Sequence, residues 1–280
     1  MTLTWIDDLG EYDLNDANGM ELVNEGLGLN MPPSQNSYES RLNADGETLA
    51  NTRYGPRMLD FEVHFYGNAM VNVARLASRL NRGPGVLRHK GWGSGQAREL
   101  RQVSREDGLT GRWSGLAHFQ QDLLTLKAAD PWWYGPMRMQ SLQFDDGVLY
   151  SDPNVLYSSP TTLYSGAPST TVLVEGDEPA VTTLKIGGPF DTLRVRPSAG
   201  AASVELSGPL AAGEEITVVS AFGDRGPRLN GASPDWSLLT PESDPIELPV
   251  GSTKIVVEAQ GADPGVSYVE VCYRERWLTP

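Results

Sequence analysis

The sequence predicts a mainly β protein, in which an α+β N-terminal domain with one helix is followed by a β-sandwich. The chain has 30 glycines and 20 prolines among 280 residues, which favours turns and short strands over long helices. Only residues 68–82 have the apolar spacing of a convincing amphipathic helix. From about residue 170 onward, strand-like segments recur about every 8–12 residues, the spacing that is typical of a sandwich.

The chain before residue 57 divides into a short strand and a long polar segment. Residues 3–7 (LTWID) are predicted to form a strand. Residues 11–56 are rich in Asn and Gly, are interrupted by Pro32-Pro33 and show little periodicity. Such a segment is long for a connection inside a compact domain. We therefore expect 11–56 to be an arm that packs on a neighbouring subunit.

The clearest strand spans 57–67 (RMLDFEVHFYG), where apolar and polar residues alternate. One face of this strand carries Leu59, Phe61, Val63 and Phe65. Because alternate residues of a strand point to the same side, this face is predicted to be buried.

The predicted helix, 68–82, follows that strand directly. Asn68 is a residue type favoured at the N-cap, and Gly83-Pro84 ends the helical pattern. The apolar face is predicted to consist of Met70, Val73, Ala77 and Leu80. Further strands predicted at 85–90, 98–104 and 122–128 complete the first domain, which ends near residue 130.

The predicted sandwich follows a strand at 137–144 and a proline-containing linker. Residues 149–169 hold three successive seven-residue units that begin LYS, and their Pro steps favour extended or turn conformations. Eight strands are then predicted at 170–175, 181–187, 192–197, 203–208, 215–220, 245–250, 253–259 and 267–277. In the last of them Val269, Val271, Tyr273 and Trp277 alternate with polar residues, as in an antiparallel strand with one buried face.

The charge is acidic and unevenly distributed. The formal net charge is −14; residues 1–140 carry 17 acids and 14 bases, and residues 141–280 carry 19 acids and 8 bases. This balance argues against nonspecific binding to nucleic acid or to an anionic membrane, both of which need a cationic surface. Residues 75–112 hold nine Arg or Lys and three acids. We interpret this stretch as a solvated or intersubunit face, because a nucleic-acid contact would need interleaved aromatic residues.

Cysteine content and hydropathy narrow the class of protein further. Cys272 is the one cysteine, so an intrachain disulfide is excluded, and its position in an alternating strand predicts a small buried apolar role. The first ten residues have no basic segment followed by an apolar run, so no secretory signal is predicted. The longest charge-free run, 153–174, contains three prolines and many hydroxyl residues and cannot be a membrane span.

Motifs for catalysis, cofactors or metals are absent from the sequence. His64, His89 and His118 lie on three different predicted strands without metal-ligand spacing. The sequence WGSGQ at 92–96 lacks the spacing of a nucleophile elbow. We therefore predict no enzyme, no catalytic residue, no cofactor and no metal site. The alternative, a hydrolase, would require a cleft that gathers His118, Asp122 or other ionisable groups.

The aromatic residues of the sandwich have two interpretations. Trp236, Tyr268, Tyr273 and Trp277 would fill a sandwich core, and the alternation already explains the last two. Exposed aromatics of a sandwich also stack on sugars, so Trp236 and Tyr268 are candidate glycan-facing residues. Core packing is the favoured interpretation.

A third aromatic group, Trp132, Trp133 and Tyr134, lies between Pro131 and Gly135-Pro136. The Asp130-Pro131 step favours an extended turn at the end of the preceding strand. We predict that the three rings pack at a seam between domains or subunits, with sugar binding as the minor alternative.

The order of these segments resembles the distal tail protein family of long-tailed, non-contractile phages, whose members are also described as phage tail family or minor tail proteins. The resemblance rests on KAADPWWYG at 127–135 and on the strand at 57–67 followed by a helix. In the second half it rests on the segments that begin at Gly176 and Leu210 and on SYVEVCYRERWL at the end. It covers most of the chain, although the LYS repeat does not match the family.

The resemblance implies a split-barrel N-terminal domain at 1–136 that includes the 11–56 arm. A linker and first sandwich strand would occupy 137–168, and a galectin-like or carbohydrate-module-like sandwich would occupy 169–280. Members are structural virion proteins that form a homo-hexameric ring around the DNA passage at the distal end of the tail. The implied partners are the tail tube, tape measure and tail-associated tip proteins, with assembly in the host cytoplasm. The alternative function is a carbohydrate-binding module that contacts host cell-wall glycans.

Overall fold

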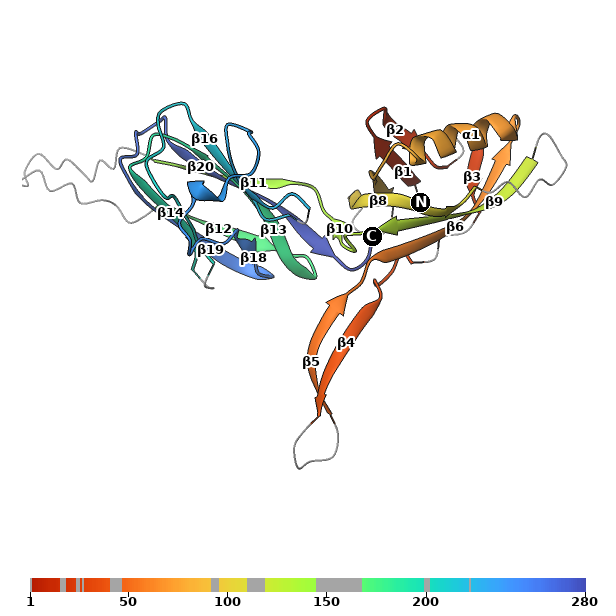
Figure 1. The fold of residues 1–280 in the computed structure, drawn as a ribbon, viewed down its shortest axis with the longest axis horizontal. Coiled ribbons are helices and arrows are strands. Elements are labelled where there is room, and N and C mark those ends of the chain that lie inside the picture. Colours follow the sequence, from red (N-terminus) through yellow and green to blue (C-terminus); the bar gives the residue numbers. More distant parts are fainter. Residues whose placement is uncertain are drawn as a thin grey trace, which may run out of the picture. The chain divides into compact units, whose positions relative to one another are not determined.

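The structure is a computed structural model, and it describes residues 2–15, 19–23, 26, 28–40, 47–91, 96–109, 119–144, 168–198, 202–221 and 223–280. Antiparallel strands account for most of this part of the chain, and α1 (Ala69–Leu80) is its one α-helix (Figure 1). The predicted mainly β class is therefore confirmed. Within the same residues, no helix combines the length and the apolar composition that a membrane crossing requires.

The chain forms two compact units, and their boundaries differ from the predicted ones. Unit 1 comprises Met1–Pro136 and Arg276–Pro280, and unit 2 comprises Met137–Glu275. The last five residues thus belong to the first unit, whereas the sequence placed them in the sandwich. The strand at 138–143 is already part of unit 2. Most of the LYS repeat falls on residues 145–167, outside the described residues.

Unit 1 is built around one antiparallel sheet of long strands. Its strands are β1 (Thr2–Asp7), β2 (Gly10–Asp13), β3 (Met20–Leu22), β6 (Arg57–Tyr66), β7 (Gly85–Lys90), β8 (Arg98–Gly108), β9 (Phe119–Ala128) and β10 (Trp133–Tyr134). Strand β6 pairs with β9 along its full length and with β3 on its other side. The predicted alternation in β6 is confirmed, because all four apolar residues of the predicted face are completely buried.

Helix α1 packs on this sheet with a face that was only partly predicted. Ala69, Leu76 and Leu80 are buried, whereas Met70 is 53% exposed. The spacing of the buried residues follows the helical period as well as the predicted set does, so the sequence alone left the rotation of the helix undetermined. The Asn68 side chain makes no cap hydrogen bond.

The 11–56 segment is not one arm. Its first part supplies β2 and β3 to the sheet of unit 1, and Tyr12, Leu14 and Met20 are buried in the core. These apolar residues are few and irregularly spaced, so the sequence shows no strand period in this segment. The strands β4 (Ser34–Ser40) and β5 (Glu47–Tyr54) form a separate two-stranded hairpin, which restricts the arm to this hairpin (Figure 1).

Unit 2 is a sandwich of two antiparallel sheets. A four-stranded sheet has the order β12 (Ser169–Val174), β19 (Gly251–Gln260), β14 (Thr192–Pro197), β15 (Val204–Glu205). The other sheet, called the large sheet below, has the order β17 (Gly226–Leu229), β16 (Glu215–Val219), β13 (Glu178–Gly187), β20 (Tyr268–Trp277), with β11 (Arg138–Gln143) beside β20 and β18 (Glu247–Leu248) beside β13. Apolar side chains from both sheets form one core.

Strand β20 and its neighbours confirm some of the sequence interpretations and correct others. Tyr273 and Cys272 are buried, as predicted, and Tyr273 belongs to the core between the sheets. Trp277, however, packs against the core of unit 1, because β20 continues past the sandwich. The strand β17 was not predicted, since Gly226 and Pro227 are residue types that usually mark turns.

Candidate functional site

The candidate site in unit 1 is the aromatic cluster, defined as Trp132, Trp133, Tyr134 and Trp277. Strand β10 places Trp133 opposite Leu100 of β8 on one side and Trp277 of β20 on the other. The Trp133 ring is completely buried, and its Nε1 donates to the Leu29 carbonyl at 3.2 Å. The burial of a large ring with a satisfied N–H makes this residue an anchor of the unit 1 core.

Arg57 is completely buried beside this cluster, with its guanidinium carbon 5.9 Å from the Trp133 ring centroid. Its Nε and Nη2 donate to the Pro131 carbonyl at 3.0 and 2.8 Å, and Nη2 also donates to the Leu278 carbonyl at 3.0 Å. Nη1 donates to the carbonyls of Gly28, Leu29 and Asn30. One guanidinium therefore joins three backbone segments that are far apart in the sequence.

Burial lowers the pKa of Arg57 to about 10, so the side chain still carries its charge at neutral pH. The sequence analysis did not identify Arg57 as a buried residue, although the alternation of its strand indicates it. Arg57 has the same parity as Leu59 and Phe61 in the alternating strand, which places it on the buried face. A cation on a buried face needs several acceptors, and here backbone carbonyls provide them.

Asp130 and Tyr134 form a buried pair in the same cluster. The Tyr134 hydroxyl donates to Asp130 Oδ2 at 2.5 Å, and the Trp132 backbone N–H donates to Oδ1 at 3.3 Å. Burial raises the pKa of Asp130, an effect that outweighs the opposing hydrogen bonds and the nearby Arg276 and Arg101. Burial beside Asp130 also raises the pKa of Tyr134.

The raised pKa of Asp130 predicts a pH dependence of stability. Between the unfolded and folded pKa values the folded state holds a proton that the unfolded state has lost, so this group's stabilisation falls as the pH rises. The difference in unfolding free energy between wild type and Asp130→Asn should therefore decrease from about pH 4 upward. Urea unfolding of both proteins at several pH values measures it, and a pH-independent difference would contradict the assignment.

The three predicted seam residues are packed within unit 1. Trp133 and Tyr134 are buried, and Trp132 is half-buried with its ring centroid 5.0 Å from that of Tyr54, at the end of the hairpin. The Arg276 guanidinium carbon lies over the Trp132 ring, 5.6 Å from its centroid. These rings do not form an open stacking platform. Their role at a seam between domains or subunits stays a prediction.

Several cations of the basic stretch at 75–112 are engaged by groups of their own unit. Arg79 pairs with Asp7 at 2.9 Å, and Arg88 pairs with Glu99 at 3.1 Å. Arg98 stacks on Trp277, with 4.0 Å between its guanidinium carbon and the ring centroid. Cations held in this way present no continuous basic surface for phosphates.

The structure offers no metal site among the residues it describes. In those residues no group of three His, Cys, Asp or Glu side chains is placed to hold a metal ion. His89 is buried against Trp133, and burial lowers its pKa. His118, which the hydrolase alternative needs, lies outside the described residues.

The two candidate glycan-facing residues both lie outside the sandwich core. Trp236, in the short 3-10 helix η1 (Trp236–Leu238), is 49% exposed, and Tyr268 at the start of β20 is half-buried. Neither belongs to the core cluster of unit 2. The favoured interpretation of these two residues as core was therefore wrong.

Comparison with known proteins gives structural matches only. No protein-family model and no curated protein sequence matches the chain. The Dit protein of phage SPP1, described as a paradigm of the hub adsorption apparatus in phages that infect Gram-positive bacteria, aligns with a TM-score of 0.66 and 13% identity over 98% of both chains. Chains from two structures of the activated phage P2 baseplate, with calcium and with strontium, align with a TM-score of 0.59. They share 8% and 9% identity over 100% of this chain and 99% of theirs.

These matches span both units and leave almost no part of either chain unaligned. At such low identity they establish a common fold and carry no residue-level correspondence. The chain therefore has the fold of the SPP1 Dit protein and of a component of the P2 baseplate.

Proposed function

We propose that this chain is a structural virion protein, the distal hub of a phage tail. In this role six copies form a ring around the DNA passage. The ring connects the tail tube and tape measure proteins to the tip proteins that recognise the host. The fold that the chain shares with a phage adsorption hub over its whole length supports the tail assignment. A role in assembly, rather than catalysis, agrees with the nature of those relatives.

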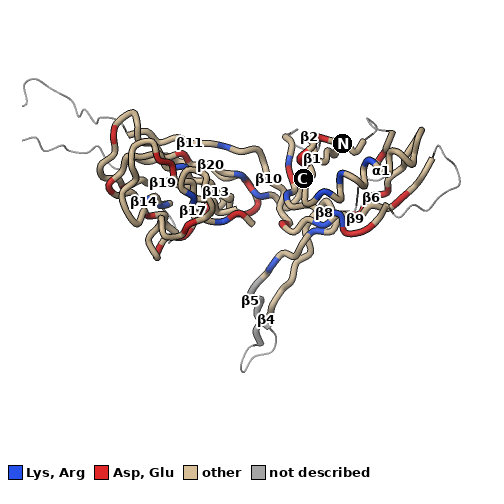
Figure 2. The backbone as a smooth tube through the Cα atoms, turned by 45° about the horizontal axis from the view of Figure 1, so that its top comes forward, with Lys and Arg blue, Asp and Glu red and all other residues tan. Residues whose placement is uncertain are grey.

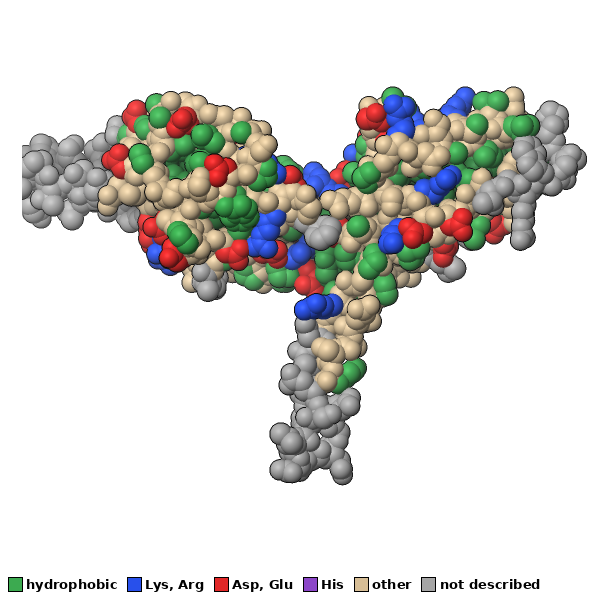
Figure 3. All heavy atoms as spheres, viewed as in Figure 1, with side chains coloured by type: hydrophobic (Ala, Val, Ile, Leu, Met, Phe, Trp, Pro, Cys, Tyr) green, Lys and Arg blue, Asp and Glu red, His purple; other side chains and the backbone are tan. Residues whose placement is uncertain are grey.

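The observation that carries the ring proposal is the β4–β5 hairpin. Its two strands pair with each other, and neither makes an extensive contact with another helix or strand that the structure describes. Tyr38 is 55% exposed, and the described side chains of the hairpin are mostly neutral and polar (Figure 3). A two-stranded hairpin is at best marginally stable alone in water. We therefore expect the hairpin to pack on a surface of the next copy. A contact of this kind, repeated from copy to copy, closes into a ring.

The outer face of the sheet in unit 1 carries acidic side chains, as expected of a surface that lines the DNA passage. On β6 and β3 it carries Glu21, Asp60 and Glu62, opposite the side that packs in the core. Figure 2 colours the acidic positions of the chain red. Tyr66 donates to Glu21 at 2.7 Å, and Thr125 donates to Asp60 at 2.6 Å, which fixes these carboxylates on the sheet. Fixed negative charges repel the DNA phosphates, so DNA would pass such a wall without binding to it.

Removal of the hairpin tests the ring proposal. The Gly55 backbone N–H donates to the Pro33 carbonyl at 2.8 Å, so residues 34–54 can be replaced by two glycines without a gap. We expect the shortened protein to keep the circular dichroism of the wild type but to lose assembly. Light scattering after size exclusion measures the mass of the purified protein, and electron microscopy of tails carrying each version measures incorporation at the distal end.

A matched control keeps the hairpin and changes only an exposed side chain elsewhere, as in Val266→Ala of unit 2. This variant should assemble like the wild type. Six-fold rings that form equally well without residues 34–54 would refute the role of the hairpin. Virion density that places the chain away from the distal end of the tail would refute the hub function itself.

A further inference from the structure

The large sheet of unit 2 turns one face away from the sandwich core. Ile216 and Val218 point into the core, so Glu215 and Thr217 between and beside them point outward. The register continues this outer face from Gly187 through Glu215 and from Lys185 through Thr217 to Arg228. Along β20 the same face carries Tyr268 and Glu270. Among the described residues of unit 2, the two aromatic residues outside the core, Tyr268 and Trp236, both lie over this face.

Tyr268 lies flat on the backbone of Gly187. A Cβ atom at Gly187 would stand only 2.2 Å from the Tyr268 ring, so only glycine leaves room for the ring there. The Tyr268 hydroxyl donates to Glu215 Oε2 at 2.7 Å, and this hydrogen bond is the main cause that raises the pKa of Tyr268 to about 12. The half-buried Tyr268 ring is thus held by its contact with Gly187 and by the hydrogen bond of its hydroxyl.

Trp236 packs against Gly226 of β17 at an ordinary van der Waals distance. A Cβ atom at Gly226 would be 3.6 Å from two atoms of the indole, which is otherwise largely exposed. The short helix that carries Trp236 is fixed on both sides. Asp235 accepts from the Ser237 N–H and hydroxyl at 3.0 and 2.7 Å, and its own N–H donates to the Pro227 carbonyl at 2.8 Å.

The space between the two rings is polar. Gly187 and Gly226 are separated by four residues along β16 and by two strand spacings across the sheet, so they lie roughly 16 Å apart, the length of a short oligosaccharide. Lys185 with Glu270, at 3.9 Å, and Arg228 with Asp224, at 2.5 Å, lie on or beside the path between them. Charged and hydroxyl groups of this kind can hydrogen-bond to many hydroxyls at once.

We propose that this face binds an uncharged saccharide, with Tyr268 and Trp236 stacking on its sugar rings. The electron-rich face of an aromatic ring attracts the weakly positive C–H groups of a pyranose. A protein partner would instead need a contiguous apolar centre, whereas here two single rings are separated by charges. Acids outnumber bases around the path, and both cations are paired, which disfavours a phosphate-bearing polymer.

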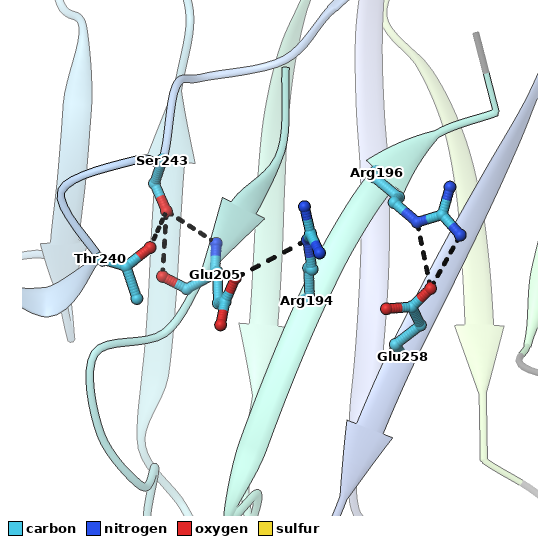
Figure 4. A network of polar contacts seen from close by, with 6 residues as sticks. All are labelled: Arg194, Arg196, Glu205, Thr240, Ser243 and Glu258. Atoms are coloured by element: carbon cyan, nitrogen blue, oxygen red, sulfur yellow. Dashed lines mark hydrogen bonds and ion pairs between the residues drawn. The ribbon is translucent and has the colours of Figure 1, made fainter. Parts of the chain in front are cut away.

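The outer face of the four-stranded sheet differs from that of the large sheet. The strands of the four-stranded sheet contain no aromatic residue. Their outer side carries ion pairs, Arg194 with Glu205 at 3.7 Å and Arg196 with Glu258 at 2.9 Å, beside a hydroxyl pair of Thr240 and Ser243 (Figure 4). Among the described residues of unit 2, the aromatic side chains outside the core therefore lie on the large sheet and not on the four-stranded sheet.

Titration of the full-length protein with oligosaccharides tests the proposal. The probes are chitotetraose, cellotetraose and maltotetraose as neutral ligands and lipoteichoic acid as the anionic one, with binding measured by calorimetry. We expect at least one neutral tetrasaccharide to bind. Trp236→Ala should weaken that binding by about tenfold or more, equivalent to about 1.4 kcal/mol, and so should Tyr268→Ala. Tyr268→Phe keeps the ring and should weaken it by much less.

Leu173→Ala is the matched control, because Leu173 is 51% exposed on the four-stranded sheet. It should leave binding unchanged. The proposal is overturned if no neutral probe binds, if only lipoteichoic acid binds, or if Trp236→Ala binds like the wild type. A loss of binding in Leu173→Ala as large as in Trp236→Ala would also overturn it. Assembly into rings is measured separately and does not depend on this result, so the hub function and the saccharide site can fail independently.

Discussion

Replacement of Arg57 with Met is expected to lower the free energy of unfolding of unit 1 by about 3–5 kcal/mol. The guanidinium is completely buried and donates to carbonyls in the 28–30 segment, at Pro131 and at Leu278. Methionine has a comparable length but no donor, so these buried carbonyls would lose their partners, each at a cost of about 1–3 kcal/mol before relaxation. Water that enters the site would recover part of this loss.

Chemical denaturation, with hydrogen exchange of β6 and β9 to assign the transition to unit 1, measures the effect of Arg57→Met. Arg57→Lys should fall between wild type and Arg57→Met. A lysine retains the charge, but its single ammonium cannot reach three segments at once. Arg53→Met is the control, because Arg53 is exposed on the hairpin, and its effect should stay within about 0.5 kcal/mol. A loss below about 1 kcal/mol in Arg57→Met would show that the carbonyls find other partners.

The parts of the fold that the sequence predicted well are those with a strong local period. Strand β6 alternates over ten residues, and its partner β9 and the strands of the sandwich other than β17 were found by the same signal. Helix α1 was located within two residues at each end. In each case the residues that set the period are neighbours in the chain, so no tertiary information was needed.

The parts that could not be predicted depend on contacts between distant segments. Strands β2 and β3 are short, and they are strands because β1 and β6 offer edges to them. The C-terminal Trp277 follows the alternation of β20 but packs in unit 1, which no local pattern indicates. Such assignments follow from the tertiary arrangement, in which propensity is a weak guide.

In the candidate sites, too, the sequence indicated the residue types, whereas their burial depends on contacts between distant segments. The sequence singled out all six aromatic residues of these sites, but it could not say which were buried. Trp133 is an anchor because it is completely buried and Leu29 accepts from its indole N–H, whereas Trp236 lies on the short helix η1 and is 49% exposed. Gly187 is a residue type that usually weakens a strand, yet here it leaves room for the Tyr268 ring. Gly226 has a φ of +140°, a conformation that favours glycine.

The adjacent residues Trp132 and Trp133 provide a second test, in which each serves as a control for the other. Trp133→Ala is expected to cost about 3–5 kcal/mol of unfolding free energy, because it removes a completely buried ring and leaves a cavity. Trp132→Ala should cost only about 1–2 kcal/mol, because that ring is half-buried against Tyr54 and Arg276.

The two substitutions should also differ in what they disturb. Trp132 packs on Tyr54 at the base of the β4–β5 hairpin, so its loss should loosen the hairpin and weaken assembly while unit 1 remains folded. Trp133 lies in the core, so its loss should lower stability first and assembly only as a consequence. Unfolding curves and the mass of the assembled protein, measured on both variants, separate these outcomes. Equal losses of stability would contradict the assignment of Trp133 as the core anchor and of Trp132 as the support of the hairpin.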